Sequence, residues 1–202
     1  MFSRFKTFYV KYNIIKFIFF LPVKFFRFYK RKILSDKAYI KNHYFETFNI
    51  KLDLKDPKTF TAKMQWLKLN DKNPLYTLCA DKHKVRDYVK EKIGSKYLIP
   101  LIHVTNKPSL IPFDDLPSEY IIKTNHTSGY NLIVKEGKMY SFSTVENFDK
   151  IKLIKKTQSW LNINVFYQNR EWEYKNIEPK IIIEELLQDE TGNKVLNDYK
   201  FH

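Results

Sequence analysis

The stretch YIIKTNHTSGYNLIV, residues 120–134, decides the fold of this chain. Its two apolar runs are rich in β-branched and aromatic residues, which is typical of strands, and we expect strands at 119–124 and 131–135. A polar turn containing one glycine, Gly129, joins them. Such a turn can present backbone N–H groups to an anion, while Lys123 supplies a point charge for a phosphate. A plain surface hairpin also accounts for these residues, so this stretch alone leaves phosphate binding open.

The segments on either side complete an α+β (α/β) pattern, because helices come first and a mixed β-sheet lobe follows. Glu136-Gly137 is a hairpin signal, and Gly94 is suited to ending a helix. We expect helices at 37–48, at 59–69, from Asn73-Pro74 onward, at 81–93 and at 145–161. We expect further strands at 97–102, 138–142, 180–187 and 194–201, with a turn at 189–193 before the last strand. The predicted domains are a basic aromatic segment (1–36), a helical region (37–95) and the sheet lobe (96–202).

The counts of glycine, cysteine and histidine exclude several kinds of site. The four glycines lie at least eight residues apart, which excludes the dinucleotide fingerprint and the P-loop. With Cys79 as its one cysteine, the chain has no internal disulfide and no cysteine zinc cluster, and it fits a reducing compartment. The five histidines are never four apart, so a helical two-histidine zinc site is absent.

The positive charge is concentrated at one end of the chain. Of the formal net charge of +14, residues 1–35 carry +9, from nine Lys/Arg and no Asp/Glu, and they also hold 12 of the 34 aromatic residues. Interleaved basic and aromatic side chains suit an anionic membrane surface. The longest uncharged run, 17–23, is far shorter than the roughly 20 residues of a spanning helix. We therefore expect a cytoplasmic protein, peripheral at the inner face of the plasma membrane.

Two other interpretations of this segment stay open. Residues 1–35 could form a basic helix packed on the body or on a partner, or the same charges could bind nucleic-acid phosphates. No recognised nucleic-acid fold signature follows them, so nucleic acid is not an expected partner.

An apolar strand ends in two adjacent acids, Glu184 and Glu185. Neighbouring strand positions face opposite sides of a sheet, so only one of the two carboxylates can point toward the core. The other must face a cleft, solvent or a partner, and a solvated strand end would explain it. Residues 80–89 are a third candidate stretch, in which Asp81 is a plausible helix cap and structure alone accounts for the pattern.

Taken together, these stretches resemble the TupA-like ATP-grasp family. This family is tied to teichuronopeptide, capsular and other cell-surface polysaccharide synthesis and is often filed among glycosyltransferases. The resemblance covers residues 37–202. The motifs that carry it, in the family's order and spacing, are DPKTFTAKMQWLKL (56–69), NPLY (73–76), ADK (80–82), VRDYV (85–89), KTNHTSGYN (123–131), REW (170–172), EE (184–185) and DYKF (198–201).

The resemblance implies an ATP clamped between two lobes, with Mg²⁺ neutralising its phosphates. Lys123 would meet the α and β phosphates, and the strand from Glu184 to Leu187 would be the hinge against adenine. Lys200, the candidate catalytic residue, would point toward the phosphates or the acceptor. The other nucleotide-binding candidates that the resemblance implies are Asn125, His126, Ser128 and Gly129 in the loop, and Glu185 and Asp189 near the base or ribose.

The chain departs from the family's pattern in places. Ala62 stands where glutamate is usual, and Thr127 and Tyr130 stand where glycines are common, which stiffens the loop. The family continues beyond Lys200 into a lobe that supplies the Mg²⁺ ligands, so we expect these ligands from that missing lobe and none from this chain.

Three functions follow as hypotheses. The first is the nucleotide-binding part of an ATP-dependent carboxylate–amine ligase that acts on a cell-surface polymer precursor. The second is a glycosyltransferase of the same pathway, although the chain has no Asp-x-Asp to anchor a sugar nucleotide. The third is a truncated remnant without activity, or a half that assembles with a separately encoded C-terminal lobe.

Overall fold

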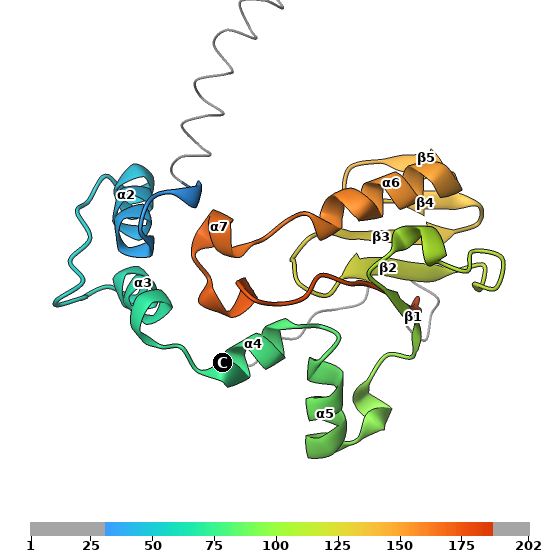
Figure 1. Ribbon diagram of the computed structural model, residues 1–202, viewed down its shortest axis with the longest axis horizontal. Coiled ribbons are helices and arrows are strands. Elements are labelled where there is room, and N and C mark those ends of the chain that lie inside the picture. Colours follow the sequence, from blue (N-terminus) through green and yellow to red (C-terminus); the bar gives the residue numbers. More distant parts are fainter. Residues whose placement is uncertain (1–30, 188–202) are drawn as a thin grey trace, which may run out of the picture. The chain divides into compact units, whose positions relative to one another are not determined.

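The computed structural model of the 202-residue chain describes residues 31–187. These residues form two compact units (Figure 1). The described part of the first comprises residues 31–71 and 167–170, and that of the second comprises residues 72–166 and 171–187. The predicted membrane-surface segment lies almost wholly outside the described residues, as do the turn expected at 189–193 and the strand expected at 194–201.

The first unit is built on two capped helices, α2 (Asp36–Phe48) and α3 (Phe60–Asn70). The side chains of Ser35 and Thr59 accept hydrogen bonds from backbone N–H groups in the first turns, at 3.3 and 3.2 Å, and so satisfy donors that a helix start leaves open. A small core of Ile40, Tyr44, Leu52 and Ala62 holds the helices together. Both helices predicted from the sequence are confirmed.

Residues 167–170 join this unit through Arg170, which follows helix α7 (Phe166–Asn169). The Arg170 guanidinium lies 4.3 Å from the ring centre of Tyr39, and its Nε lies 3.0 Å from Asp36 Oδ1. The side chain also donates to the carbonyl oxygen of Arg31 at 2.9 Å. The guanidinium is buried, and these partners offset the free-energy cost of removing its charge from water.

The second unit contains a six-stranded sheet in the order β1-β6-β2-β3-β4-β5. Between residues 31 and 187 all of its pairings are antiparallel, and the α+β class is confirmed. Helices before the sheet belong to this unit as well, namely α4 (Pro74–Ala80) and α5 (Val85–Ile93). The strands are β1 (Leu101–Thr105), β2 (Tyr120–Thr124), β3 (Asn131–Lys135), β4 (Lys138–Tyr140), β5 (Val145–Asn147) and β6 (Ile181–Glu185).

One face of the sheet packs in the hydrophobic core of the second unit. Helix α6 (Lys150–Leu161) lies along the sheet in Figure 1, and its Leu153 and Trp160 belong to the same buried cluster as Ile122, Ile181 and Ile183. Side chains alternate between faces along a strand, so the residues between these core positions point to the opposite face. That opposite face carries the candidate site.

Several element boundaries differ from the sequence predictions. The strand expected at 97–102 begins at Leu101, after the 3₁₀ turn η1 (Ser95–Tyr97). The helix expected at 145–161 begins at Lys150, because Asp149 caps it and residues 145–147 pair with β4 instead. The helix expected at 81–93 begins at Val85. The Glu136-Gly137 hairpin is confirmed, with φ of 52° and 67° at its two turn residues. The short elements η2 (Pro108–Leu110) and η3 (Trp172–Tyr174) were not predicted.

Within residues 31–187, no helix is both long and apolar enough to cross a lipid bilayer.

Candidate functional site

Lys123 and Glu184 lie together on the sheet face opposite the core. Strands β2 and β6 pair with Lys123 opposite Ile182 and Ile121 opposite Glu184. Lys123 and Glu184 are therefore diagonal neighbours on one face, which long side chains can bridge. Lys123 Nζ lies 2.5 Å from Glu184 Oε2. The structure thus joins two residues that the family resemblance assigned to opposite ends of a nucleotide.

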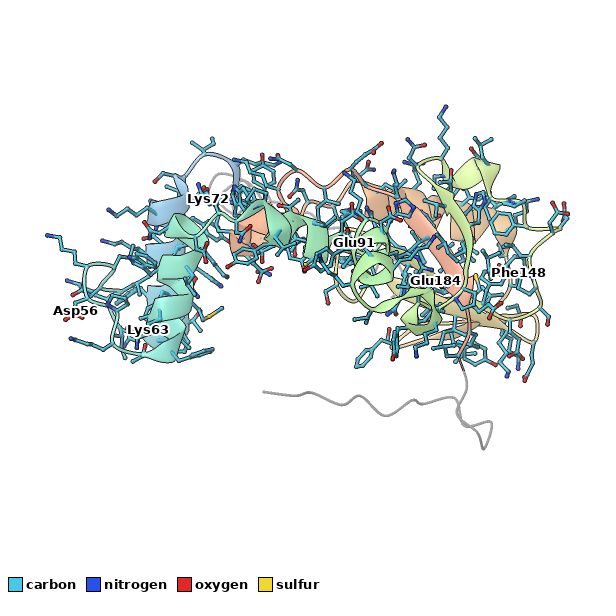
Figure 2. All side chains as sticks on the ribbon, turned by 90° about the horizontal axis from the view of Figure 1, so that it is seen from below. Asp56, Lys63, Lys72, Glu91, Phe148 and Glu184 are labelled. Carbon is cyan, nitrogen blue, oxygen red and sulfur yellow. The ribbon has the colours of Figure 1, made fainter. Side chains whose placement is uncertain are left out.

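The Glu184 carboxylate also meets a second cation, Arg86 of α5. Arg86 Nη1 lies 3.1 Å from Glu184 Oε1, and Nη2 donates to the carbonyl oxygen of Ile99 at 2.5 Å. The Glu184 side chain is only 4% exposed, against 17% for Arg86 and 21% for Lys123. Figure 2 shows Glu184 on β6 near helix α5, which carries the labelled Glu91. A carboxylate this buried needs a cationic partner, since an unpaired buried charge is strongly destabilising.

Lys82 adds a third cation at the turn after β2. Its Nζ donates to the carbonyl oxygen of Thr127, and its backbone N–H donates to Asn125 O at 3.0 Å. Burial, followed by the positive charge of Lys123, lowers the pKa of Lys82, while Asp81 and Glu184 oppose this shift. Lys82, Arg86 and Lys123 thus lie around two buried carboxylates, Glu184 and Asp81, and this excess of cations favours an anionic ligand.

Asn125 is the structural centre of the turn. Its side chain is fully buried and its Nδ2 donates to Asp81 Oδ1 at 3.0 Å and to Glu178 O at 2.9 Å. Its Oδ1 accepts from Lys180 N at 2.7 Å. Asp81 in turn accepts from His83 N and Lys84 N, so it caps the turn that leads into α5. Asn125 therefore connects the approach to α5, the turn after β2 and the approach to β6.

His126 is also buried, and both of its ring nitrogens face oxygen atoms. Nδ1 lies 3.1 Å from Asn125 Oδ1, and Nε2 lies 3.0 Å from Ile163 O. Burial lowers the pKa of His126, and the hydrogen bond to Ile163 only partly opposes this shift. In the structure, the side chains of Asn125 and His126 are thus occupied by protein groups.

The tip of the turn is exposed, in contrast to its base. Ser128 and Gly129 are both exposed, and Gly129 has φ +78°, a conformation that other residues rarely adopt. Below them, the hydroxyl groups of Thr124 and Thr127 share a hydrogen bond inside the core. The loop predicted to close over phosphates therefore consists of a buried base and an exposed tip. Of its four candidate residues, Asn125 and His126 are buried, and Ser128 and Gly129 are exposed.

The two adjacent acids point to opposite sides, as the strand pattern predicted. Glu184 is buried, whereas Glu185 is exposed and its backbone N–H donates to Pro100 O at 3.1 Å. Leu187, the last described residue, is exposed as well. Asp189 and Lys200 lie outside the described residues.

Sequence reasoning did not assign Lys82 or Arg86 to the site. Arg86 lies 98 residues before Glu184, so no local pattern connects them. Both residues belong to motifs of the family resemblance, Lys82 to ADK and Arg86 to VRDYV. These motifs could have indicated the two cations, but a capped helix already explained them.

A cationic cluster beside an exposed glycine turn fits the phosphates of a nucleotide. For a metal ion the described residues do not fit: between 31 and 187 no group of three or more His, Cys, Asp or Glu side chains is placed to hold one. We therefore assign no step of the chemistry to Mg²⁺ on these residues.

Comparison with known proteins identifies a family. The model of a family described as TupA-like ATPgrasp matches residues 62–202, from the first turn of α3 onward. Neither the curated proteins nor the solved structures yielded a match to this chain.

Proposed function

This chain belongs to the TupA-like ATP-grasp family, and we propose that its second unit binds the phosphates of ATP through Lys82 and Lys123, beside the buried carboxylate of Glu184. The observation that carries the proposal is the cationic excess around a buried carboxylate, beside an exposed glycine turn. A polyanionic ligand would neutralise that excess, because charges attract strongly where solvent is partly excluded. In the free protein Lys123 forms an ion pair with Glu184, and a bound phosphate would share the Lys123 ammonium with Glu184 or replace Glu184 as its partner.

At the phosphate end, we assign Lys123 to the α and β phosphates, with Lys82 beside it. The exposed tip at Ser128 and Gly129 would close over them, because backbone N–H groups in a turn can cradle an anion. Asn125 and His126 would act indirectly, by holding the base of the turn against the approach to β6.

At the base end, we assign the chain from Glu184 to Leu187 to adenine. Backbone groups at the end of β6 would meet the base edge, and the exposed Glu185 carboxylate would meet the base or ribose. Asp189 and Lys200 stay assigned by resemblance to the ribose and to the phosphates or acceptor.

The reaction that we propose is ATP-dependent joining of a carboxylate to an amine in cell-surface polysaccharide synthesis. A carboxylate oxygen of the acceptor would bond to the γ-phosphorus as ADP leaves, and the amine would then bond to the acyl carbon as phosphate leaves. Catalysis of such a transfer rests on positioning and charge neutralisation, which are the properties of a cluster of fixed cations.

We further propose that residues 1–35 hold the protein at an anionic membrane surface, on the cytoplasmic side. Support comes from their charge of +9 without one acidic residue. Each basic residue near such a surface contributes about 1 kcal/mol.

The test of ATP binding is thermal unfolding of the full chain with and without ATP. A ligand at about 100 times its Kd stabilises the folded state by about 2.7 kcal/mol. We expect ATP to raise the Tm of the natural protein and of a control, Lys138→Ala, an exposed lysine on β4. Lys123→Ala should abolish the increase. Equal increases in all three proteins, or none in any, would contradict the proposal.

A further inference from the structure

Arg86 connects three parts of the second unit through one guanidinium group. Nη1 binds Glu184 Oε1 on β6, and Nη2 binds the carbonyl oxygen of Ile99, just before β1. The same region is joined by the backbone bond from Glu185 N to Pro100 O at 3.1 Å. A planar fork with several donors can serve two acceptors at once, which a lysine ammonium does less well. Arg86 therefore sets where the Glu184 carboxylate lies.

The two oxygens of Glu184 are held in different ways. Oε1 accepts a directed hydrogen bond from Arg86. Oε2 is buried and receives no hydrogen bond from the described part of the chain, although Lys123 Nζ lies 2.5 Å away as an ion pair. Arg86 thus holds Oε1 by a directed, charge-assisted hydrogen bond, and Lys123 forms an ion pair with Oε2.

We propose that Arg86 is a positioning residue that prevents Glu184 from fully occupying Lys123. Without Arg86, the buried carboxylate would have to satisfy its charge on Lys123, the cation that already touches Oε2. With Arg86 in place, Lys123 can turn from Glu184 to a phosphate without leaving a bare buried charge. This inference rests on the proposed function for its consequence in ATP binding, but the competition for Lys123 exists without any ligand.

The competition can be measured directly on the free protein. Lys123 in the full chain is acylated with a water-soluble acetylating reagent, and its rate is followed by peptide mass spectrometry, with the exposed Lys138 as internal reference. We expect Arg86→Gln to slow Lys123 acylation by about tenfold, close to the lower end of what one charge-assisted hydrogen bond contributes. Arg86→Lys should give an intermediate rate, since it keeps the charge but not the fork.

A second substitution separates positioning from mere support of the fold. Glu184→Gln in the Arg86→Gln background removes the competing carboxylate and should return the Lys123 rate to that of the natural protein or above. In this double variant both side chains are neutral, so no carboxylate at position 184 is left buried without Arg86. The double variant can therefore still be tested if Arg86→Gln alone fails to fold. Lys90→Gln, an exposed lysine of the same helix, is the matched control and should leave the rate unchanged.

ATP affinity, measured by calorimetry on the same proteins, should follow the same order, with a loss of about tenfold in Arg86→Gln and recovery in the double variant. An unchanged Lys123 rate in Arg86→Gln, or no recovery in the double variant, overturns the inference. If the Lys123 rates change as expected but no protein binds ATP, the competition stands and the proposed nucleotide function fails.

Discussion

Replacing Asn125 with alanine tests whether the buried base of the turn is held by this one side chain. The change removes the amide that joins three segments: the turn before α5, the turn after β2 and the approach to β6. None of these segments is adjacent to another in sequence. We expect Asn125→Ala to destabilise the second unit without touching its hydrophobic core.

The magnitude follows from the partners that lose their hydrogen bond. Asp81 Oδ1 keeps its bonds from His83 N and Lys84 N, at 2.9 and 3.2 Å, so it is largely compensated. Glu178 O, Lys180 N and the His126 ring each lose a partner. At about 1 kcal/mol for each lost bond, the free energy of unfolding should fall by about 3 kcal/mol. For a chain of this size, that loss lowers the Tm by about 6–12 °C.

The measurement is urea denaturation of the full chain, followed by tryptophan fluorescence and compared with Asn131→Ala. Asn131 is exposed at the start of β3, and its loss should change the free energy of unfolding by less than about 0.5 kcal/mol. A difference below about 1 kcal/mol between Asn125→Ala and the control would refute the view that Asn125 is the connecting residue.

Three other outcomes follow from the structure and the charge pattern. Burial lowers the pKa of His126 below its ordinary 6.5, so the stability that depends on the neutral ring is fully present above pH 6.5 and is lost as the pH falls through the lowered pKa. We expect the free energy of unfolding of the natural protein to fall below about pH 6.5 and His126→Gln to reduce this fall. Urea denaturation at several pH values measures both. Gly137→Val should cost about 1–2 kcal/mol because φ is +67° there, whereas Gly137→Asn should cost less, as thermal unfolding would show. The full chain should sediment with anionic vesicles and not with neutral ones, and glutamine replacement of the basic residues in 1–35 should abolish this, while replacement of Lys138 and Lys155 should not.

Patterns local to the chain predicted much of the fold. Thr59 before an apolar run indicated the cap of α3, and Glu136-Gly137 indicated the hairpin, because caps and tight turns depend on a few adjacent residues. The boundary between β5 and α6 was missed because Val145–Asn147 becomes a strand only by pairing with β4. The opposite orientation of Glu184 and Glu185 was predicted correctly, since a strand alternates its faces.

By itself, the sequence determined the α+β class, the family, and the presence of a lysine before a glycine turn and of paired acids after an apolar strand. Only the tertiary structure decided which groups meet. It placed Glu184 between Lys123 and Arg86, and it placed the candidate residue Asn125 where its buried amide connects distant segments. The reason is physical: strand periodicity and capping act over a few residues, whereas the pairing of a buried charge depends on which distant segments the sheet order and helix packing bring together.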